Sequence, residues 1–149
     1  MPAHSRLPAL IEKLRQHGHR ITPQRVAILE AVTQDSRHPT VEQVYEAVRG
    51  EYPMTSLATV YKTIALMKEE GEILELGFGS GSSRFDGARP YPHPHLVCVE
   101  CQRIIDLEVQ TFDELPGKLA DQYGFEIVSH RVDYYGICPD CRANSSSTR

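Results

Sequence analysis

Residues 55–78, TSLATVYKTIALMKEEGEILELGF, change from a helical pattern to a strand pattern at Gly71. Before this glycine, apolar residues recur at the spacing of an amphipathic helix, with Thr55 or Ser56 as its N-cap. Beyond it, EILELGF and the later SSRFD at 82–86 predict two short strands around the flexible turn GSGS. A helix that leads directly into a β-hairpin is typical of a winged helix-turn-helix, in which that helix enters the DNA major groove. The helix residues expected to face inward are Leu57, Val60, Ile64 and Met67.

Three further helices are predicted before this segment. Their apolar stripes lie in LPALIEKLRQHG at 7–18, RITPQRVAILEAVTQD at 20–35 and HPTVEQVYEAVRGEYP at 38–53. Thr22 and Thr40 are the expected N-caps of the second and third helices, because each hydroxyl can accept a hydrogen bond from an unpaired backbone N–H. The N-terminal part of the chain is therefore predicted to be a helical DNA-binding domain.

The C-terminal part is predicted to be a smaller α/β domain. Its expected elements are strands at 95–101 and 103–109, a helix at 111–124 and a long strand at 125–138. A unit of this size buries little apolar surface, so a bound metal or a dimer partner is expected to stabilise it. The predicted fold class is α+β, a winged helix-turn-helix followed by a small α/β dimerisation domain with a four-cysteine zinc site. The expected boundaries are 1–86 for the DNA-binding domain, 87–92 for a hinge, 93–142 for the dimerisation domain and 143–149 for a disordered tail.

Composition and charge describe a globular chain of 149 residues, with 40% hydrophobic and 24% charged residues. The lack of a long apolar run and of a signal-peptide core favours a cytoplasmic protein. The formal net charge is −4, but residues 1–90 carry 11 Lys+Arg against 11 Asp+Glu, whereas residues 91–149 carry 5 against 9. A local basic patch matters more for DNA binding than the total charge. The residues expected to form such a patch are Lys13, Arg15, His17, His19, Arg20 and Arg25.

Four cysteines form two CxxC pairs, Cys98 with Cys101 and Cys138 with Cys141. In a reducing compartment two such pairs favour metal binding over disulfides, and four thiolates suit a tetrahedral structural zinc that catalyses nothing. A thioredoxin-like role is disfavoured, because neither pair is predicted to begin a helix after a strand. Two unrelated thiol pairs remain the alternative.

His93 and His95 alternate along a predicted strand, so both rings are expected on one face. Taken alone, such a pair is more often a solvated strand edge than a metal site. Other candidate ligands lie at junctions between elements: His38, Asp86 and Asp106. Three imidazoles and two carboxylates suit Fe(II), Mn(II) or Zn(II), and donor softness selects none of these ions. If the five side chains converge, one ion would link the two domains and could switch DNA affinity.

Four polar residues are expected on the outer face of the helix that precedes the hairpin: Ser56, Thr59, Tyr61 and Lys62. Hydroxyl groups and Lys62 can bond to phosphates, and the ring of Tyr61 can pack on thymine methyl groups. The alternative is an ordinary solvated helix face, which is common for small hydroxyl residues.

These motifs together resemble the ferric uptake regulator superfamily. The segments that carry the resemblance, within residues 6–142, are RITPQRVAILE, HPTVEQVYEAV, LATVYKTIALMKEEG, SSRFD, HPHLVCVECQRIIDLE and YYGICPDC. The resemblance implies a homodimeric winged-helix repressor in which the four cysteines hold structural zinc. It also implies that Arg20 enters the minor groove and that the dimer binds an inverted repeat in AT-rich double-stranded DNA. The residues implied to hold a regulatory ion are His38, Asp86, His93, His95 and Asp106.

The branch of the superfamily that senses peroxide is the most similar, because position 106 is Asp where iron-responsive members tend to carry Glu. The resemblance implies that Fe(II) or Mn(II) at the regulatory site supports DNA binding. Hydrogen peroxide then reacts with bound Fe(II), a histidine corresponding to His38 or His93 gains an oxygen, and the repressor leaves its DNA. Manganese supports DNA binding without this chemistry.

Some features depart from the family pattern or leave alternatives open. Pro92 and Pro94 occupy positions that supply ligands to a second metal site in several iron-responsive members. A second site near Asp113 and His130 is therefore expected to be weak or absent. An iron- or zinc-responsive repressor of metal-uptake genes is the alternative within the family. A small metal-dependent hydrolase is the alternative outside it, but no nucleophile motif or substrate-enclosing loop is visible, so the chain is not expected to be an enzyme.

Overall fold

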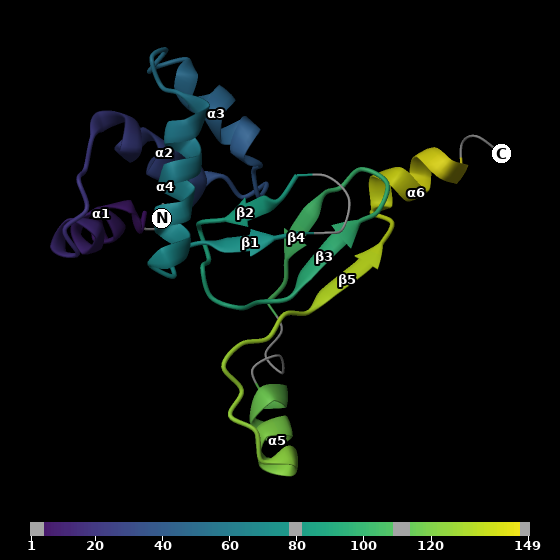
Figure 1. Cartoon of the computed structure of the whole chain (residues 1–149). Coiled ribbons are helices and arrows are strands. Elements are labelled where there is room, and N and C mark those ends of the chain that lie inside the picture. Colours follow the sequence, from purple (N-terminus) through teal and green to yellow (C-terminus); the bar gives the residue numbers. More distant parts are fainter. Residues whose placement is uncertain (1–4, 78–81, 109–113, 147–149) are drawn as a thin grey trace. The chain divides into compact units, whose positions relative to one another are not determined.

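The structure, a computed structural model, describes residues 5–77, 82–108 and 114–146. The chain divides into an N-terminal unit, Met1–Tyr91, and a C-terminal unit, Pro92–Arg149. Within these described ranges, the first unit contains four helices and a β-hairpin, and the second contains three strands and two helices (Figure 1). Across the described ranges, no helix combines the length and the apolar character that crossing a membrane requires.

The four helices of the N-terminal unit are α1 (Leu7–Gln16), α2 (Pro23–Gln34), α3 (Val41–Arg49) and α4 (Leu57–Glu69). Hydroxyl caps set three of their starts, as the sequence predicted. Thr22 and Ser56 each accept a hydrogen bond from the backbone N–H three residues on, and Thr40 forms a reciprocal capping box with Gln43. Gly71, with a φ of 69°, follows α4 in the left-handed conformation that glycine adopts without steric cost.

A continuous apolar core holds these helices together, and burial of its side chains favours folding. The inward face of α4 differs from the prediction at one position. Leu57 lies in the first turn, where a helix has fewer neighbours, and is 38% exposed, whereas Leu66 is buried. The core consists of Leu10, Leu14, Ile28, Leu29, Val32, Val41, Val44, Val48, Val60, Ile64, Leu66, Met67, Ile73 and Phe85.

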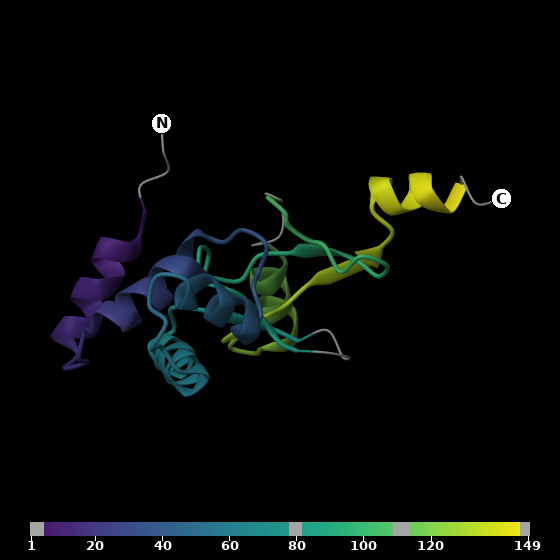
Figure 2. The ribbon, with the colours of Figure 1, turned by 90° about the horizontal axis from the view of Figure 1, so that it is seen from above.

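A β-hairpin follows α4 directly. Strands β1 (Leu74–Leu76) and β2 (Arg84–Asp86) pair antiparallel, with Leu74 opposite Asp86. The predicted turn GSGS lies largely outside the described residues. Figure 2 looks almost along the axis of α4, which lies on one side of α2 and α3. The order of helices and hairpin confirms the predicted winged helix-turn-helix.

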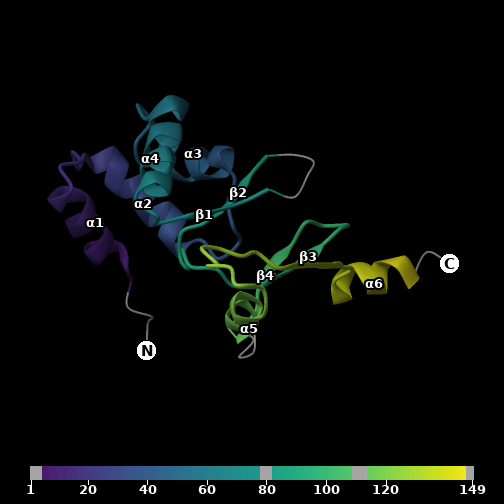
Figure 3. The ribbon, with the colours of Figure 1, turned by 60° about the horizontal axis from the view of Figure 1, so that its bottom comes forward.

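The sheet of the C-terminal unit has three strands, β3 (His95–Cys98), β4 (Ile104–Asp106) and β5 (Asp133–Gly136). Strand β3 lies in the centre, antiparallel to β4 and parallel to β5 (Figure 1). Helix α5 (Glu114–Tyr123) buries none of its own residues and lies below the sheet in Figure 1; Figure 3 turns this helix toward the reader. Helix α6 (Pro139–Ser146) follows β5.

The strands of this unit are shorter than predicted. The long strand expected at 125–138 is confined to β5, and the prediction was wrong for residues 125–132. Strand β3 pairs with β5 over four residues, and the Val132 carbonyl still accepts a hydrogen bond of 3.2 Å from the His95 N–H, but the structure describes no strand over residues 125–132. The strand expected at 95–101 ends at Cys98, because the chain turns there and Gln102 adopts a φ of 64°.

The end of the chain also differs from the expectation. Helix α6 runs to Ser146, so residues 143–146 are helical where a disordered tail was predicted. Pro139 at the first helical position and Asp140 in the first turn both favour the start of a helix, and the residues that follow continue it.

Candidate metal centres and nucleic-acid interface

The two CxxC pairs come together within the C-terminal unit. Cys98 ends β3, Cys101 lies in the turn to β4, Cys138 follows β5 and Cys141 lies in α6. The four sulfur atoms all lie within 4.8 Å of one another, and Sγ of Cys101 is 3.8 Å from Sγ of Cys138. Four sulfurs at the zinc–sulfur distance of about 2.3 Å form a tetrahedron with edges of about 3.8 Å. The cluster therefore fits a tetrahedral zinc ion.

Electrostatics inside the cluster favours a bound cation. Hydrogen bonds from the backbone at Cys101 and Cys138 lower the pKa of Cys98 to about 6. The N–H of Cys138 lies 3.3 Å from the Cys98 sulfur. Hydrogen bonding with the neighbouring Cys138 sulfur, together with burial, raises the pKa of Cys141. A divalent ion would stabilise all four thiolates at once and so oppose the rise in the pKa of Cys141.

One pair has a context that the sequence did not predict. Cys138 follows β5 and Cys141 lies in α6, which is the strand-then-helix order of redox-active CxxC pairs. The prediction that neither pair has this context was wrong, because a helix, α6, begins at Pro139, directly after Cys138. The sulfur atoms of the other pair, Cys98 and Cys101, lie within 4.8 Å of those of Cys138 and Cys141. This closeness favours a four-thiolate metal site over an isolated dithiol.

His38 and Asp86 lie side by side in the N-terminal unit. Nε2 of His38 is 3.3 Å from Oδ2 of Asp86, and both residues are 2% exposed. Oδ1 of Asp86 accepts hydrogen bonds from the backbone N–H groups of Ala88 and Arg89, so Oδ2 is the oxygen that faces the imidazole. His38 has a φ of 59°, and its carbonyl accepts a hydrogen bond from Arg84 Nε in β2. Backbone contacts thus hold both side chains in place.

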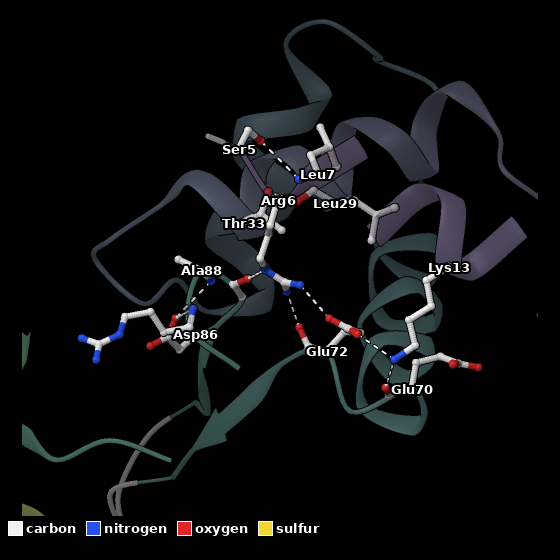
Figure 4. Close-up of polar contacts among 12 residues, drawn as sticks. Ser5, Arg6, Leu7, Lys13, Leu29, Thr33, Glu70, Glu72, Asp86 and Ala88 are labelled. Carbon is white, nitrogen blue, oxygen red and sulfur yellow. Dashed lines mark hydrogen bonds and ion pairs between the residues drawn. The ribbon is translucent and has the colours of Figure 1, made fainter. Parts of the chain in front are cut away.

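Gly87 anchors the end of β2 against α2. A Cβ atom at Gly87 would lie 2.5 Å from Cγ1 of Val32 and 2.8 Å from the Val32 carbonyl oxygen, so the close approach requires glycine. Arg6 donates a hydrogen bond of 2.6 Å to the Gly87 carbonyl and also contacts Glu72 (Figure 4). The residue that follows Asp86 is therefore fixed from two sides.

His93 and His95 converge on Asp106 in the C-terminal unit. Their Nε2 atoms lie 3.1 and 3.3 Å from Oδ1 of Asp106, and their ring centroids are 4.5 Å apart. Both imidazoles are buried, at 4% and 1% exposure. The antiparallel register places His95 directly opposite Asp106, which explains the convergence. Two imidazoles and a carboxylate are donors that Fe(II), Mn(II) and Zn(II) accept.

A second carboxylate, Asp133, flanks His95 from the other side of β3. The parallel register places His95 opposite Asp133, and Oδ1 of Asp133 is 3.3 Å from Nδ1 of His95. Oδ2 accepts a hydrogen bond of 2.7 Å from Arg131 Nε. A carboxylate beside Nδ1 favours the tautomer that carries its proton on Nδ1, in which the lone pair of Nε2 can bind a metal. The sequence did not indicate this residue, because only the pairing of β5 with β3 brings it to His95.

The second metal site expected to be weak or absent stays a prediction. Asp113 lies outside the described residues, and His130 is half-buried in the segment before β5.

The predicted DNA-contacting residues of α4 differ in how their polar groups are used. Ser56 Oγ caps the helix and lies 2.9 Å from Thr59 Oγ1. Tyr61 is 50% exposed, and its hydroxyl lies 3.4 Å from a carboxylate oxygen of Glu42. Lys62 is exposed, and its ammonium makes no hydrogen bond or ion pair with the residues that the structure describes.

Arg20, the remaining predicted DNA contact, is also exposed, and its guanidinium has no described partner. It borders a pocket of about 330 Å³ in the N-terminal unit. The sequence did not predict this pocket, which is formed where the starts of α2 and α4 approach each other. The residues that line it are Arg20, Thr22, Gln24, Arg25, Met54, Thr55, Thr59 and Lys62.

Half of the predicted basic patch contacts two glutamates, Glu70 and Glu72. Lys13 Nζ lies 2.7 Å from Oε1 of Glu72 and donates to the Glu70 carbonyl (Figure 4). His17 and His19 contact the two carboxylate oxygens of Glu70 at 2.5 and 2.9 Å. Hydrogen bonds from His19 and then His17 lower the pKa of Glu70. The predicted patch was therefore too wide: the cations of α1 are used within the unit.

Comparisons with known proteins agree on one family. The model of the ferric uptake regulator family matches residues 16–135. The chain is 40% identical over 141 residues to the peroxide operon regulator of Bacillus subtilis, covering 95% of this chain and 96% of the relative. It is 36% identical over 132 residues to the peroxide-responsive repressor PerR of Staphylococcus aureus, covering 89% and 88%.

Solved structures show the same fold. The Campylobacter jejuni peroxide stress regulator superposes with a TM-score of 0.73 at 30% identity, covering 89% of this chain and 98% of that one. The Helicobacter pylori ferric uptake regulator Fur superposes with a TM-score of 0.76 at 20% identity, covering 91% of each chain.

Proposed function

This chain belongs to the ferric uptake regulator family, and from that membership we propose that it represses transcription until hydrogen peroxide inactivates it. It is a metal-dependent transcriptional repressor and not an enzyme, so the hydrolase alternative is excluded. Regulators of this family bind DNA operators as dimers. The two curated relatives described above are named for peroxide, which supports peroxide sensing over sensing of iron or zinc supply. We place the repressor in the cytoplasm, where free cysteines persist.

One ion in each subunit is proposed to be structural. The four cysteines would hold Zn²⁺ and link the end of β3 to the start of α6. All four coordination positions would then be filled by sulfur, so this ion stabilises the C-terminal unit and binds no substrate.

A second ion in each subunit is proposed to be regulatory, either Fe²⁺ or Mn²⁺. The observation that carries this proposal is the convergence of the buried His93 and His95 on one oxygen of Asp106. The buried pair of His38 and Asp86 in the N-terminal unit offers further donors of the same kind. An ion that takes ligands from both units would make DNA binding depend on metal occupancy. The proposed ligands are His38, Asp86, His93, His95 and Asp106.

Peroxide sensing is proposed to use the imidazoles of this ligand set. Fe(II), when bound, supplies the electrons that convert hydrogen peroxide into an oxidant for a neighbouring side chain. His38 or His93 is the proposed acceptor of one oxygen atom: the O–O bond of peroxide breaks, a C–O bond replaces a C–H bond of the imidazole, the second oxygen leaves as water, and the ring supplies the two electrons overall. An oxygenated imidazole is a weaker ligand, so the affinity for metal falls and the repressor releases its DNA. Asp106 holds His93 and His95 in position for this chemistry.

The DNA-bound form is proposed to be a homodimer on an inverted repeat in AT-rich DNA. Its DNA contacts would come from the exposed side of α4 and from the segment before α2. Apolar residues left uncovered on α5, namely Leu115, Leu119 and Tyr123, support a subunit interface, because they are 55%, 39% and 65% exposed. The proposed DNA-contacting residues are Arg20, Ser56, Thr59, Tyr61 and Lys62.

The experiment begins with a DNA duplex that the manganese-loaded protein selects from a random pool. The zinc-containing protein is loaded with Fe(II) without oxygen, treated with one equivalent of peroxide, and then assayed for intact mass and for binding to that duplex. We expect one added oxygen on His38 or His93 and loss of DNA binding. Manganese-loaded protein, the control, should keep both its mass and its DNA affinity.

The outcome also separates the alternatives. Unchanged mass, with DNA binding that follows only the iron or zinc concentration, would assign the protein to control of metal uptake. An Asp106→Glu variant tests the peroxide-sensing assignment further, since we expect metal-dependent DNA binding to persist while sensitivity to peroxide falls.

A further inference from the structure

We propose that the pocket between the starts of α2 and α4 binds one phosphate group of the DNA backbone, and that the hydroxyl of Thr55 donates a hydrogen bond to it. This inference rests on the proposed DNA-binding function and assigns a role to a residue outside the predicted set of DNA contacts. The pocket, of about 330 Å³, lies entirely within the N-terminal unit.

The charge of the pocket suits an anion. Arg20, Arg25 and Lys62 line it, and its described lining includes no carboxylate. The Arg25 guanidinium donates to the Arg20 carbonyl at 2.5 Å, whereas the charged ends of Arg20 and Lys62 have no partner in the described parts of the chain. Several other cations of this unit have a carboxylate partner, as Lys13 has Glu72 and Lys68 has Glu75. Two cationic groups without a described partner thus line the pocket.

Thr55 supplies the second, independent observation. Its side chain is 4% exposed, and its Oγ1 has no hydrogen-bond partner among the described residues. A buried hydroxyl without a partner costs free energy, and replacing it by a methyl group would remove that cost. Neighbouring hydroxyls are used: Thr22 caps α2, and Ser56 bonds with Thr59. A ligand in the pocket would give Thr55 the acceptor that the described residues do not provide.

The position of the pocket is a third feature that favours binding of a phosphate. Thr22 is the N-cap of α2, a helix of 12 residues, and Thr55 immediately precedes the N-cap of α4, a helix of 13 residues. Helix N-termini carry partial positive charge and favour phosphate oxygens. Phosphate contacts orient a recognition helix on DNA without selecting bases, and this is the role we assign to the pocket.

The test compares two substitutions at Thr55 that separate the hydroxyl from the methyl group. Thr55→Val removes the hydroxyl and keeps the shape of the side chain. Thr55→Ser keeps the hydroxyl and removes the methyl group. Thr33→Val is the control, because Thr33 is buried in α2, bonds to the Leu29 carbonyl and does not line the pocket. Each manganese-loaded protein is titrated with the selected duplex over a range of salt concentrations, and its urea unfolding is measured in parallel.

We expect Thr55→Val to bind DNA about tenfold more weakly, since a hydrogen bond to a charged group is lost. Its resistance to urea should be equal to or greater than that of the wild type. Thr55→Ser should bind within about twofold of the wild type, and its stability should fall with the buried methyl group. In Thr55→Val, the slope of log affinity against log salt concentration should not change. In Lys62→Ala, this slope should be smaller by about one.

Three results would overturn the inference. Equal DNA affinity in Thr55→Val and the wild type would remove the hydroxyl from the interface while leaving the repressor proposal intact. No DNA binding by the manganese-loaded wild type would reject both proposals. Saturable binding of inorganic phosphate at the Thr55 methyl resonance, combined with unchanged DNA affinity in Thr55→Val, would reassign the pocket to a free anion.

Discussion

The two units of this repressor bury different kinds of side chain. The N-terminal unit packs a continuous apolar core around Leu14, Ile28 and Met67, each fully or almost fully buried. In the described part of the C-terminal unit, the buried residues other than Val97 and Ile104 are chiefly candidate metal ligands. Those ligands are His93, His95, Cys98 and Cys138.

Exposed apolar surface sharpens the contrast. Tyr123, Phe125 and Val128 of the C-terminal unit are 65%, 69% and 89% exposed. We expect a unit with little apolar core and much uncovered apolar surface to gain stability from bound metal and from a partner subunit. The N-terminal unit needs neither, because its core supplies the usual hydrophobic free energy. The difference predicts that metal loss unfolds one unit and spares the other.

The largest expected effect comes from breaking the cysteine cluster. Cys138→Ser removes one of four sulfurs from a site whose zinc binding is typically worth about 10 kcal/mol or more of folding free energy. We expect loss of zinc from the purified protein and unfolding of the C-terminal unit, while α1 to α4 stay folded. Zinc content by elemental mass spectrometry and amide hydrogen exchange along the chain measure both effects.

Val99→Ser is the matched control for this substitution. Val99 lies between the two cysteines of the first pair and is 60% exposed, so its replacement should change neither zinc content nor exchange. If Cys138→Ser retained zinc and the slow exchange of β3, the C-terminal unit would have a source of stability that its buried residues do not reveal.

The sequence predicted the N-terminal unit better than the C-terminal one, and the contrast between cores explains why. Hydrophobic periodicity and capping hydroxyls are local signals, and Thr22, Thr40 and Ser56 mark helix starts that the structure shows. The C-terminal unit has few buried apolar residues to create a pattern. Residues 125–132 were predicted to form a strand, but the structure describes none there, whereas α6 lies in a segment too polar to suggest order.

Candidate ligands were predictable where spacing or family resemblance marked them. Both CxxC pairs and the alternating His93 and His95 are visible in the sequence. Asp133 and Thr55 were missed for different physical reasons. Asp133 reaches His95 only through the parallel pairing of β5 with β3, which no local pattern encodes. Thr55 is distinguished by a buried hydroxyl without a described partner, and burial is a property of the fold.

A smaller effect is expected from Asp133→Asn, which probes how the C-terminal unit orients a ligand. The change keeps the size of the side chain and removes the charge beside Nδ1 of His95. We expect about tenfold weaker binding of Mn(II), measured by calorimetry, because the preference for the Nε2-donating tautomer is reduced. Zinc content and thermal unfolding should stay unchanged, and the histidine nitrogen resonances should report the altered tautomer.

Asp140→Asn serves as the control, since Asp140 pairs with the exposed Arg103 and does not contact His95. Equal manganese affinity in Asp133→Asn and the wild type would limit Asp133 to its contact with Arg131. A fall in zinc content would instead indicate that the substitution disturbs the whole sheet.

The smallest effect belongs to the charge cluster of the N-terminal unit, where a packed core already supplies most of the stability. Burial opposes ionisation of Glu72, but hydrogen bonds from Lys13 and Arg6 outweigh it and lower its pKa (Figure 4). Glu72→Gln should therefore cost about 1 kcal/mol in urea unfolding at neutral pH.

A lowered pKa means that this stabilisation is present above the ordinary pKa of a glutamate and is lost as pH falls through the value in the folded protein. The wild type and the variant should thus become equally stable in acid, whereas Glu46→Gln, which breaks an exposed pair with Arg49, should have little effect at any pH. A loss of several kcal/mol in Glu72→Gln would contradict the contrast between the units, because it would make the N-terminal unit depend on its ion pairs rather than on its core.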